Sequence, residues 1–425
     1  MANQGQNAAS LFDINLTAGS IALVLLVLIA TTIVATPAAQ AQTGTVLHNF
    51  TNGSDGGSPE AGVTFDQQGR IYGTASNGGS NGQGVVYRLV HESDGWLFSP
   101  IYSFGSRGHD GSDPEAKVIF GPNGVLYGTT YQGGAENRGT VFSLQPPASA
   151  CKAFLCSWVE TVLYSFTGGA DGAYPQFGDL AFDQAGNIYG TTGNGGSGTG
   201  CESYGCGVVF KLTRSGSGWT ESVLWNFTGG NDGAGPLSGV IFDSAGNLYG
   251  TTGFGGSIGF GTVYELSPTQ SGWIQTTLYS FTSNDYGNGA GGLIMDAQGD
   301  LFGITGDLQS GAAYELKPQN GSWSFILLQS FTGLLFTGPL TAPTFDSQGN
   351  LYGPLPNGGS EENGEIFKLF HAGDQWIYTP FYQFAGSDLG AYPIGAVTFD
   401  ASGNMYGTSS AGGTGGEGTV WEITP

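Results

Sequence analysis

The chain has 425 residues and a net charge of −23, from 33 acidic and 10 basic residues. Glycine contributes 78 residues, about 18 per cent against about 7 per cent in an average protein, without the strict period of three found in collagen. Hydrophobic residues reach 39 per cent and aromatic residues 13 per cent, which excludes a disordered polar chain. The acidic balance makes duplex nucleic acid and anionic lipid headgroups poor partners.

The first 41 residues have the features of a targeting segment. Residues 21–35 form a nearly unbroken apolar run, which has the length of a signal-peptide core and is short for a membrane span. Alanines flank Gln40 in the small-x-small pattern of a signal peptidase site, so we predict cleavage before Gln42. The usual positive charge before the apolar run is missing. The alternative is an uncleaved membrane anchor formed by residues 17–36.

Four cysteines occur as two C-x4-C pairs, Cys151 with Cys156 and Cys201 with Cys206. An even number of cysteines in an exported chain indicates disulfides, and we favour pairing within each C-x4-C, although the sequence leaves the connectivity open. A four-cysteine zinc site is the alternative. Its usual spacing is tighter, and an oxidising compartment disfavours free thiolates.

One unit of about 55 residues occurs seven times along the chain. Its centre is an aromatic residue followed by glycine, usually within YGT, after an apolar stretch that ends in FDxxGN. A GG loop, a pattern such as GTVYEL and then a Trp eight residues before a Phe follow the centre. The seven central glycines are Gly73, Gly128, Gly190, Gly250, Gly303, Gly353 and Gly407. The tryptophans are Trp96, Trp158, Trp219, Trp273, Trp323 and Trp376.

Each unit predicts four short strands joined by glycine-rich turns, because alternating apolar positions are typical of extended strands. Seven four-stranded units predict an all-β fold, a seven-bladed β-propeller formed by residues 42–425 as one domain. The last unit ends at Pro425 without its fourth strand, whereas residues 45–50 (TVLHNF) resemble a fourth strand. We therefore predict that the N-terminal strand completes the seventh blade and closes the ring.

The string AFDQAGNIYGTTGNGG at residues 181–196, followed by GVVFKL and LWNF, resembles the Gloeo_Verruco (GloVer) tandem-repeat family of exported bacterial proteins. The resemblance extends over nearly all of the chain after the targeting segment. It implies a secreted or surface location and no established catalytic activity. Family members often carry a C-terminal sorting anchor, and because no residues follow the last strand pattern here, we expect none. The D-x-x-G-N element is also similar to hairpins of NHL and gluconolactonase-like propellers, which include binders and enzymes.

Catalytic signals are weak. The four histidines fall at non-equivalent positions of the unit without metal-ligand spacing, so we assign them to the surface or to strand edges. They are His48, His91, His109 and His371. Two G-x-S-x-G strings, at residues 78–82 and 255–259, lie in the GG loop and not between a strand and a helix. We therefore assign no catalytic residue and no metal ligand.

Aspartates recur at two places in the unit. The FDxxGN set is predicted to form hydrogen bonds within its turn, and a ring that binds calcium or a cationic ligand is the alternative. This set comprises Asp66, Asp183, Asp243, Asp296, Asp346 and Asp400. A second set lies in GGxDG turns, where weak calcium binding is the alternative to turn formation. It comprises Asp55, Asp110, Asp171, Asp232 and Asp388.

The recurrent tryptophans are predicted to pack between blades. Trp225 and Trp421 depart from the repeat, and we expect them to be more exposed.

We expect an exported, non-enzymatic propeller that acts as a binding or structural module at the cell surface or outside the cell. Its partner would be a surface protein or a glycan, it would need no cofactor, and we expect a monomer. Membrane contact would arise only through an uncleaved N-terminal segment. One alternative is a calcium-assisted carbohydrate-binding lectin with equivalent sites on several blades.

The other alternative is a hydrolase or lyase with its site at one mouth of the channel. Such a site would need polar residues that break the repeat there. The strongest departures are mostly apolar, which argues against this alternative. They are Gly121, Leu308, Leu334 and Leu335.

Overall fold

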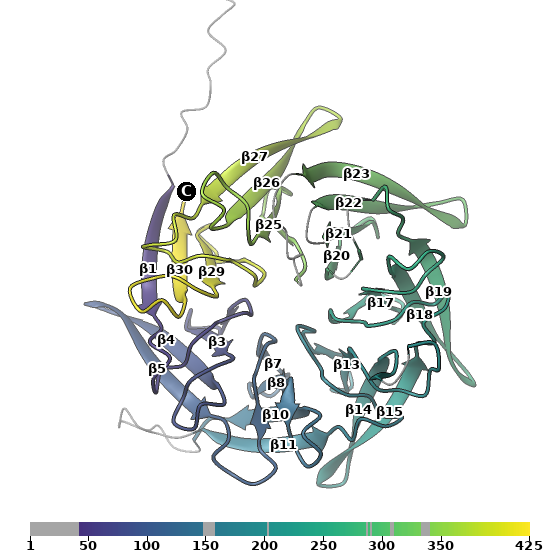
Figure 1. Ribbon diagram of the computed structural model, residues 1–425, viewed down its shortest axis with the longest axis horizontal. Coiled ribbons are helices and arrows are strands. Elements are labelled where there is room, and N and C mark those ends of the chain that lie inside the picture. The colour runs from purple at the N-terminus through teal and green to yellow at the C-terminus, as the bar shows by residue number, and fades with distance from the viewer. Residues whose placement is uncertain are drawn as a thin grey trace, which may run out of the picture. The chain divides into compact units, whose positions relative to one another are not determined.

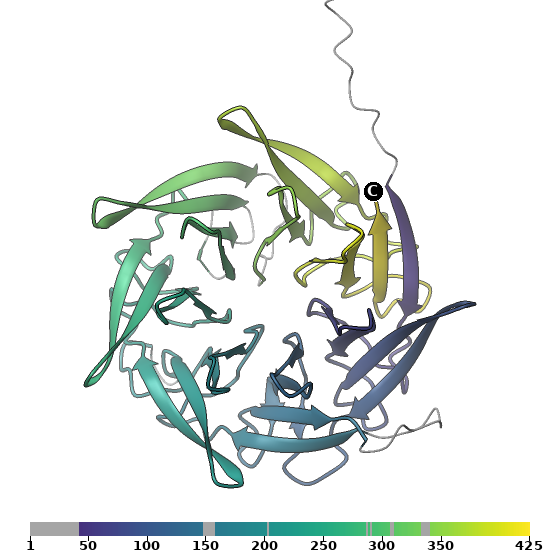
Figure 2. The ribbon, with the colours of Figure 1, turned by 180° about the vertical axis from the view of Figure 1, so that it is seen from behind.

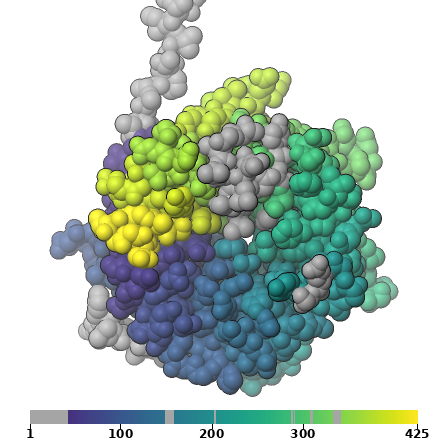
Figure 3. Space-filling view, in the orientation of Figure 1, coloured from purple at the N-terminus to yellow at the C-terminus, as the bar shows by residue number. Residues whose placement is uncertain are grey.

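The structure is a computed structural model that describes residues 42–147, 158–201, 204–285, 288–289, 291–306, 310–332 and 341–425. Residues Thr43–Thr424 form one compact unit. Seven four-stranded antiparallel sheets follow one another in a ring around a central channel, so the predicted seven-bladed β-propeller is confirmed (Figure 1). The space-filling view shows the same order of blades around the centre (Figure 3).

In each blade a short inner strand lies nearest the channel and a long outer strand lies at the rim (Figure 2). Blade 1 contains β2 Thr64–Phe65, β3 Ile71–Ala75, β4 Val85–Glu92 and β5 Gly95–Ser103. Blade 2 contains β7 Ile119–Phe120, β8 Leu126–Thr130, β10 Thr140–Gln145 and β11 Val159–Ser165. Blade 3 contains β12 Ala181–Phe182, β13 Ile188–Thr192, β14 Val208–Ser215 and β15 Gly218–Asn226. Blade 4 contains β16 Ile241–Phe242, β17 Leu248–Thr252, β18 Thr262–Thr269 and β19 Gly272–Ser280.

The remaining strands complete the ring. Blade 5 contains β20 Leu293–Met295, β21 Leu301–Gly306, β22 Ser310–Gln319 and β23 Ser322–Thr332. Blade 6 contains β24 Thr344–Phe345, β25 Leu351–Leu355, β26 Glu365–Ala372 and β27 Gln375–Gln383. Blade 7 contains β28 Thr398–Phe399, β29 Met405–Ser409, β30 Thr419–Thr424 and β1 Thr43–Asn49. A small additional ribbon pairs β6 Gly111–Ser112 with β9 Gln132–Gly133.

The two ends of the chain meet in blade 7. Strand β1 pairs antiparallel with β30, from Thr43 opposite Thr424 to Asn49 opposite Thr419 (Figure 1). The predicted closure of the ring is therefore confirmed. Because the last blade combines the first and last strands of the ring, the blades cannot separate at this point without breaking a sheet.

A buried aromatic ring over the central glycine organises each blade. A Cβ atom on Gly250 would lie 2.4 Å from the Tyr264 hydroxyl oxygen, so the close approach of the ring requires glycine. The same contact recurs in every blade, and all seven rings are fully buried. The rings are Tyr87, Phe142, Phe210, Tyr264, Tyr314, Phe367 and Trp421.

This repeated contact corrects the expectation for Trp421. Trp421 is fully buried, and its indole N–H donates to the Ser409 hydroxyl at 3.1 Å. The expected exposure is wrong because Trp421 stands at the buried aromatic position of blade 7. Trp225 is half-buried, and its N–H donates to Asp232 at 3.3 Å.

The recurrent tryptophans pack between blades, as predicted. Trp158 of blade 2 lies 5.9 Å, centroid to centroid, from the Tyr72 ring of blade 1. Trp323 of blade 5 lies 6.3 Å from the Tyr249 ring of blade 4. Each tryptophan therefore adds apolar contact area where two twisted sheets meet.

The FDxxGN aspartates form their turns. In blade 4, Asp243 accepts backbone N–H bonds from Ala245 at 2.9 Å and Asn247 at 2.8 Å. It also accepts bonds from the Asn247 amide at 2.8 Å and the Tyr249 hydroxyl at 3.2 Å. The turn interpretation is confirmed, because all six aspartates of this set accept the equivalent pair of backbone bonds.

Cys201 and Cys206 form a disulfide with a Cα–Cα distance of 5.2 Å in the loop between β13 and β14, as the local pairing predicts. Cys151 and Cys156 lie outside the described residues, as does the predicted targeting segment 1–41. In the part of the chain that the structure describes, no helix has the length and hydropathy needed to cross a membrane.

Candidate functional site

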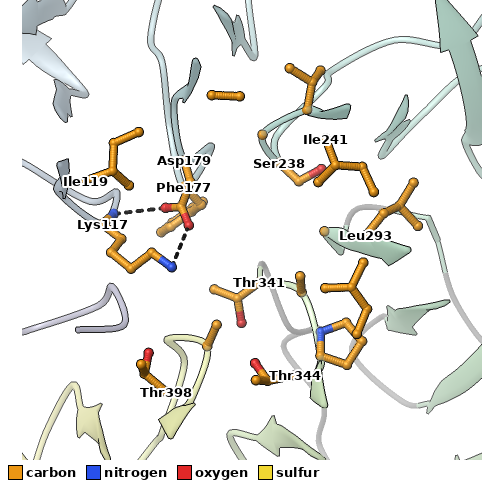
Figure 4. A pocket seen from close by; sticks show the side chains of 18 of the residues that line it. Lys117, Ile119, Phe177, Asp179, Ser238, Ile241, Leu293, Thr341, Thr344 and Thr398 are labelled. Carbon is orange, nitrogen blue, oxygen red and sulfur yellow. Dashed lines mark hydrogen bonds and ion pairs between the residues drawn. The ribbon is translucent and has the colours of Figure 1, made fainter. Parts of the chain in front are cut away.

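The central channel contains a cavity of about 680 Å³, lined by the inner strands of blades 2 to 7 and the residues that precede them. Ile119 and Ile241 contribute apolar side chains to one side of the wall, while Thr344 and Thr398 contribute methyl and hydroxyl groups on the other side (Figure 4). A cavity of this volume is within the usual range of small-molecule sites.

One position of the repeat lies at one end of this channel, which we call the mouth, four residues before the FDxxGN aspartate or its equivalent Gly121. The seven equivalent residues are Gly62, Lys117, Asp179, Gly239, Gly292, Ala342 and Ala396. Five are glycine or alanine, and the two charged ones come from neighbouring blades. Lys117 and Asp179 therefore break the repeat at the channel mouth.

These two side chains form an ion pair. The Lys117 Nζ atom lies 3.2 Å from Asp179 Oδ2, and the Lys117 backbone N–H donates to Asp179 Oδ1 at 3.1 Å (Figure 4). The side chains are 25 and 40 per cent exposed. A pair this exposed contributes about 0 to 1 kcal/mol to stability, so folding alone gives little reason for its presence.

A one-residue insertion brings Asp179 into this position. Pro175 precedes Asp183 by eight residues, whereas Pro236 precedes Asp243 by seven. The insertion also places Phe177 in the channel wall. Blade 3 thus contributes both an aromatic ring and a carboxylate to the channel wall.

The insertion has an energetic consequence in blade 2. In four other blades, the threonine after the central glycine donates its hydroxyl to a backbone carbonyl of the next blade. These bonds run from Thr74 to Ala116, Thr191 to Ser238, Thr251 to Gly291 and Thr408 to Ala61. The equivalent Thr129 hydroxyl is buried without a partner, which costs about 1 kcal/mol or more.

Two residues before this position, blades 1 and 2 carry glutamates, Glu60 and Glu115. Burial, followed by the neighbouring charges of Asp113 and Glu60, raises the pKa of Glu115 to about 8, although a hydrogen bond with Gln176 opposes the shift. Burial and the charge of Asp113 raise the pKa of Glu60 to about 7. The equivalent residues on blades 4 and 7 are Leu237 and Ile394, so this position of the repeat is acidic on blades 1 and 2 and apolar on blades 4 and 7.

The sequence-based candidates lie elsewhere. His48 contacts Asp55 at 3.1 Å, while His91 and His371 lie against Trp96 and Trp376, all outside the channel lining. Among the residues that the structure describes, no three His, Cys, Asp or Glu side chains lie together in a metal-binding group. The G-x-S-x-G strings lie in loops between strands, after β3 and after β17.

The departures taken from the sequence did not identify the site. Gly121 lies in the turn after the inner strand of blade 2, where its N–H donates to Val125, and is not part of the channel lining. Leu308, Leu334 and Leu335 lie outside the described residues. The residues that were missed are Lys117, Phe177 and Asp179. The sequence signal was a charged residue where the aligned units have glycine or alanine. For Asp179 this signal is hidden when the units are counted from their proline, because blade 3 has one extra residue there.

The fold and the channel define a seven-bladed β-propeller with an asymmetric channel mouth. The Gloeobacter/Verrucomicrobia repeat matches residues 31–201 and 157–308, and the chain belongs to this family. The resemblance inferred from the sequence is thereby confirmed. No curated protein matches the chain.

Solved structures with a similar fold have low sequence identity. A protein described as a 6-phosphogluconolactonase from Bacteroides uniformis is 15% identical with a TM-score of 0.49, and the match covers 76% of this chain and 83% of that one. Polysaccharide lyase Uly1 is 11% identical with a TM-score of 0.49, over 91% and 95% of the two chains. An oxidoreductase described as a glucose dehydrogenase from Thermus thermophilus is 14% identical with a TM-score of 0.43, over 90% and 100%. These similarities carry no argument about the activity of this chain.

Proposed function

We propose that the protein is an exported, non-enzymatic propeller that binds a small ligand at the mouth of its channel, at the cell surface or outside the cell. The observation that carries the proposal is the pair Lys117 and Asp179, which replaces glycine or alanine at the mouth. The pair contributes little to folding, and the insertion that positions it leaves Thr129 without a hydrogen bond. A repeat that tolerates such a cost at one place is typical of a functional site.

Two features support export. The apolar run at residues 21–35 precedes a small-x-small cleavage pattern. The disulfide between Cys201 and Cys206 is typical of an oxidising compartment.

The site favours a particular kind of ligand. Because Lys117 and Asp179 neutralise each other, a ligand with a single net charge would have to compete with the pair. A ligand whose polar end has both a hydrogen-bond donor and an acceptor can contact the Lys117 ammonium and the Asp179 carboxylate together. An apolar part would then lie against Phe177 and Ile241.

A blocked channel tests this proposal. Ala181 lies on the inner strand of blade 3 and lines the cavity, so Ala181→Phe fills the space without removing a charge. The full chain is expressed, and its intact mass is measured to locate the mature N-terminus. A panel of sugars, amino acids and small amphiphiles is then screened by thermal shift. We expect a mature N-terminus at Gln42 and at least one compound that stabilises the wild type but not Ala181→Phe.

The control is the same substitution at Ala245, which is exposed in the turn of blade 4. Ala245→Phe should keep the full response. A retained N-terminal segment would contradict cleavage before Gln42 and favour the anchored alternative. Equal binding by both variants would contradict a channel site. Conversion of a panel compound to product would favour an enzyme, for which the raised pKa of Glu115 would be the starting point.

A further inference from the structure

The outer strands carry a second repeated position, two residues after the tryptophan position. The register shows its equivalence, because in each blade this residue stands opposite a leucine or isoleucine of the neighbouring strand. The seven residues are Gly44, Phe98, Glu160, Glu221, Gln275, Phe325 and Tyr378. Five are uncharged, and the two glutamates occur on consecutive blades.

This position lies in the contact between one blade and the blade before it, which we call a joint. Where the residue is aromatic, it contacts a ring of the preceding blade, edge-on for Tyr378 against Phe331 and stacked for Phe98 and Phe325. Phe98 of blade 1 stacks on His48 of blade 7, with centroids 3.6 Å apart. Phe325 of blade 5 stacks on Tyr279 of blade 4, with centroids 4.9 Å apart. The environment is therefore suited to an uncharged side chain.

In the two joints that flank blade 2, a glutamate takes this place and faces a tyrosine and an aspartate of the preceding blade. Tyr102 donates to Asp110 at 2.9 Å next to Glu160, and Tyr164 donates to Asp171 at 3.1 Å next to Glu221. Each of these joints thus holds two carboxyl groups.

The aspartates accept hydrogen bonds, whereas one oxygen of each glutamate has no donor among the described residues. Asp110 also accepts backbone bonds from Ser106 and Gly111. Glu160 is only 6% exposed and Asp110 only 7%. Within the described part of the chain, the Oε1 atoms of Glu160 and Glu221 are buried and have no hydrogen-bond partner. A buried carboxylate without donors beside a second carboxylate is strongly disfavoured, whereas the protonated acid is not.

The charged neighbours agree with this assignment. Burial and then the charge of Asp110 raise the pKa of Glu160 to about 7, against an opposing effect of Arg107. Burial and then the charge of Asp171 raise the pKa of Glu221 to about 7.

We propose that Glu160 and Glu221 are proton-binding groups that make the two joints flanking blade 2 sensitive to pH near neutrality. Protonated, they are uncharged and the joints are closed, like the joints that contain Phe98 or Phe325. Ionised, they place two carboxylates in each joint and weaken it. This proposal does not depend on ligand binding in the channel.

The sign of the effect follows from proton linkage. Because the folded state holds these protons more tightly than the unfolded state, the stabilisation is complete below the ordinary glutamate pKa of about 4.5. It is lost as pH rises to about 7. Above that pH both groups are ionised in either state, and no further loss is expected from them.

The chain provides its own matched substitution, because the equivalent joint of blade 4 contains Gln275. We would compare the full-length wild type, Glu160→Gln/Glu221→Gln and Gln275→Glu by thermal unfolding at pH 5 and pH 8, with a metal chelator present. The double variant should match the wild type at pH 5 and unfold about 3 °C higher at pH 8. The midpoint temperature of Gln275→Glu should be lower than that of the wild type, and the difference should be larger at pH 8.

A local readout distinguishes joints from general charge effects. Hydrogen exchange at pH 8 should slow in β11 and β15 of the double variant and stay unchanged in β27 of blade 6. The proposal is overturned if the glutamine variant and the wild type lose stability equally between the two pH values. It is also overturned if calcium, added without chelator, raises the wild-type midpoint at pH 8 but not that of the double variant, because the pairs would then be cation sites.

Discussion

The two ends of each inner strand differ in how closely their residues follow the repeat. At one end lies the FDxxGN turn, in which aspartates such as Asp243 make the same backbone hydrogen bonds in six blades. At the other end lies the channel mouth, where the equivalent residues range from Gly239 to Lys117 and Asp179. Repetition is strict where a turn must form and relaxed where a ligand could bind.

The comparison separates residues that fold the propeller from residues that give this propeller its own properties. The turn aspartates are fully explained by local hydrogen bonds, so their recurrence implies no ring of binding sites. The mouth residues cost stability through Thr129 and recover little through their ion pair. Departures from the repeat that folding does not explain are therefore the first places to look for function.

The largest effect is expected at the turn end. Asp243→Ala removes four hydrogen bonds to one carboxylate, including two from Asn247, and should lower the free energy of unfolding by about 2 kcal/mol at pH 7. Asp374→Ala, in the exposed hairpin between β26 and β27, is the control and should change it by less than about 0.5 kcal/mol. Urea unfolding measures both.

The same variant has a defined pH dependence. Burial would raise the pKa of Asp243, but the hydrogen bonds from Asn247, Ala245 and Tyr249 together outweigh burial and lower it. The contribution of the Asp243 carboxylate to the free energy of unfolding is therefore present above its unfolded pKa of about 3.9. It is lost as pH falls through the lower pKa of the folded state. A difference between wild type and Asp243→Ala that grows on acidification would contradict this account.

A smaller effect tests whether a difference between equivalent positions of the repeat must have a function. The aromatic ring over the central glycine is Tyr264 in blade 4 and Phe210 in blade 3, and the Tyr264 hydroxyl is buried without a partner. Tyr264→Phe should raise the free energy of unfolding by up to about 1 kcal/mol, because an unsatisfied polar group is removed. A loss of stability in urea unfolding of Tyr264→Phe would contradict this expectation and indicate that the hydroxyl has a hydrogen-bond partner.

The sequence was sufficient for the fold because each blade repeats the same local chemistry. The central glycines mark the blades, and residues 45–50 match the missing strand of the last unit. The turn aspartates could be interpreted because the hydrogen bond from the Asn247 N–H to the Asp243 carboxylate is local in sequence. Trp421 was within reach as well, since GTVWEI aligns with GTVYEL and places Trp421 at the position of Tyr264.

The site could not be predicted in the same way. Lys117 is visible as a charge, but its place in the channel lining and its contact with Asp179 depend on how neighbouring blades pack in the ring. The insertion lies between Pro175 and Asp179, so an alignment counted from the proline does not pair Asp179 with Lys117, whereas one counted from the central glycine does. Glu160 and Glu221 pose the same difficulty, since the register of the outer strand decides which of its faces lies in a joint.

The most direct test of the channel mouth restores the repeat there. Lys117→Ala/Asp179→Ala gives blades 2 and 3 the side chain that Ala396 provides in blade 7, and a ligand identified by the channel screen is titrated into both proteins. The control removes another Lys–Asp pair, Lys317 and Asp300, whose Nζ and Oδ2 atoms lie 3.0 Å apart outside the channel lining.

The account predicts that the restored variant unfolds within about 1 kcal/mol of the wild type and binds the ligand at least about tenfold more weakly, while Lys317→Ala/Asp300→Ala binds normally. Unchanged binding by the restored variant would contradict the claim that this break in the repeat is the binding site.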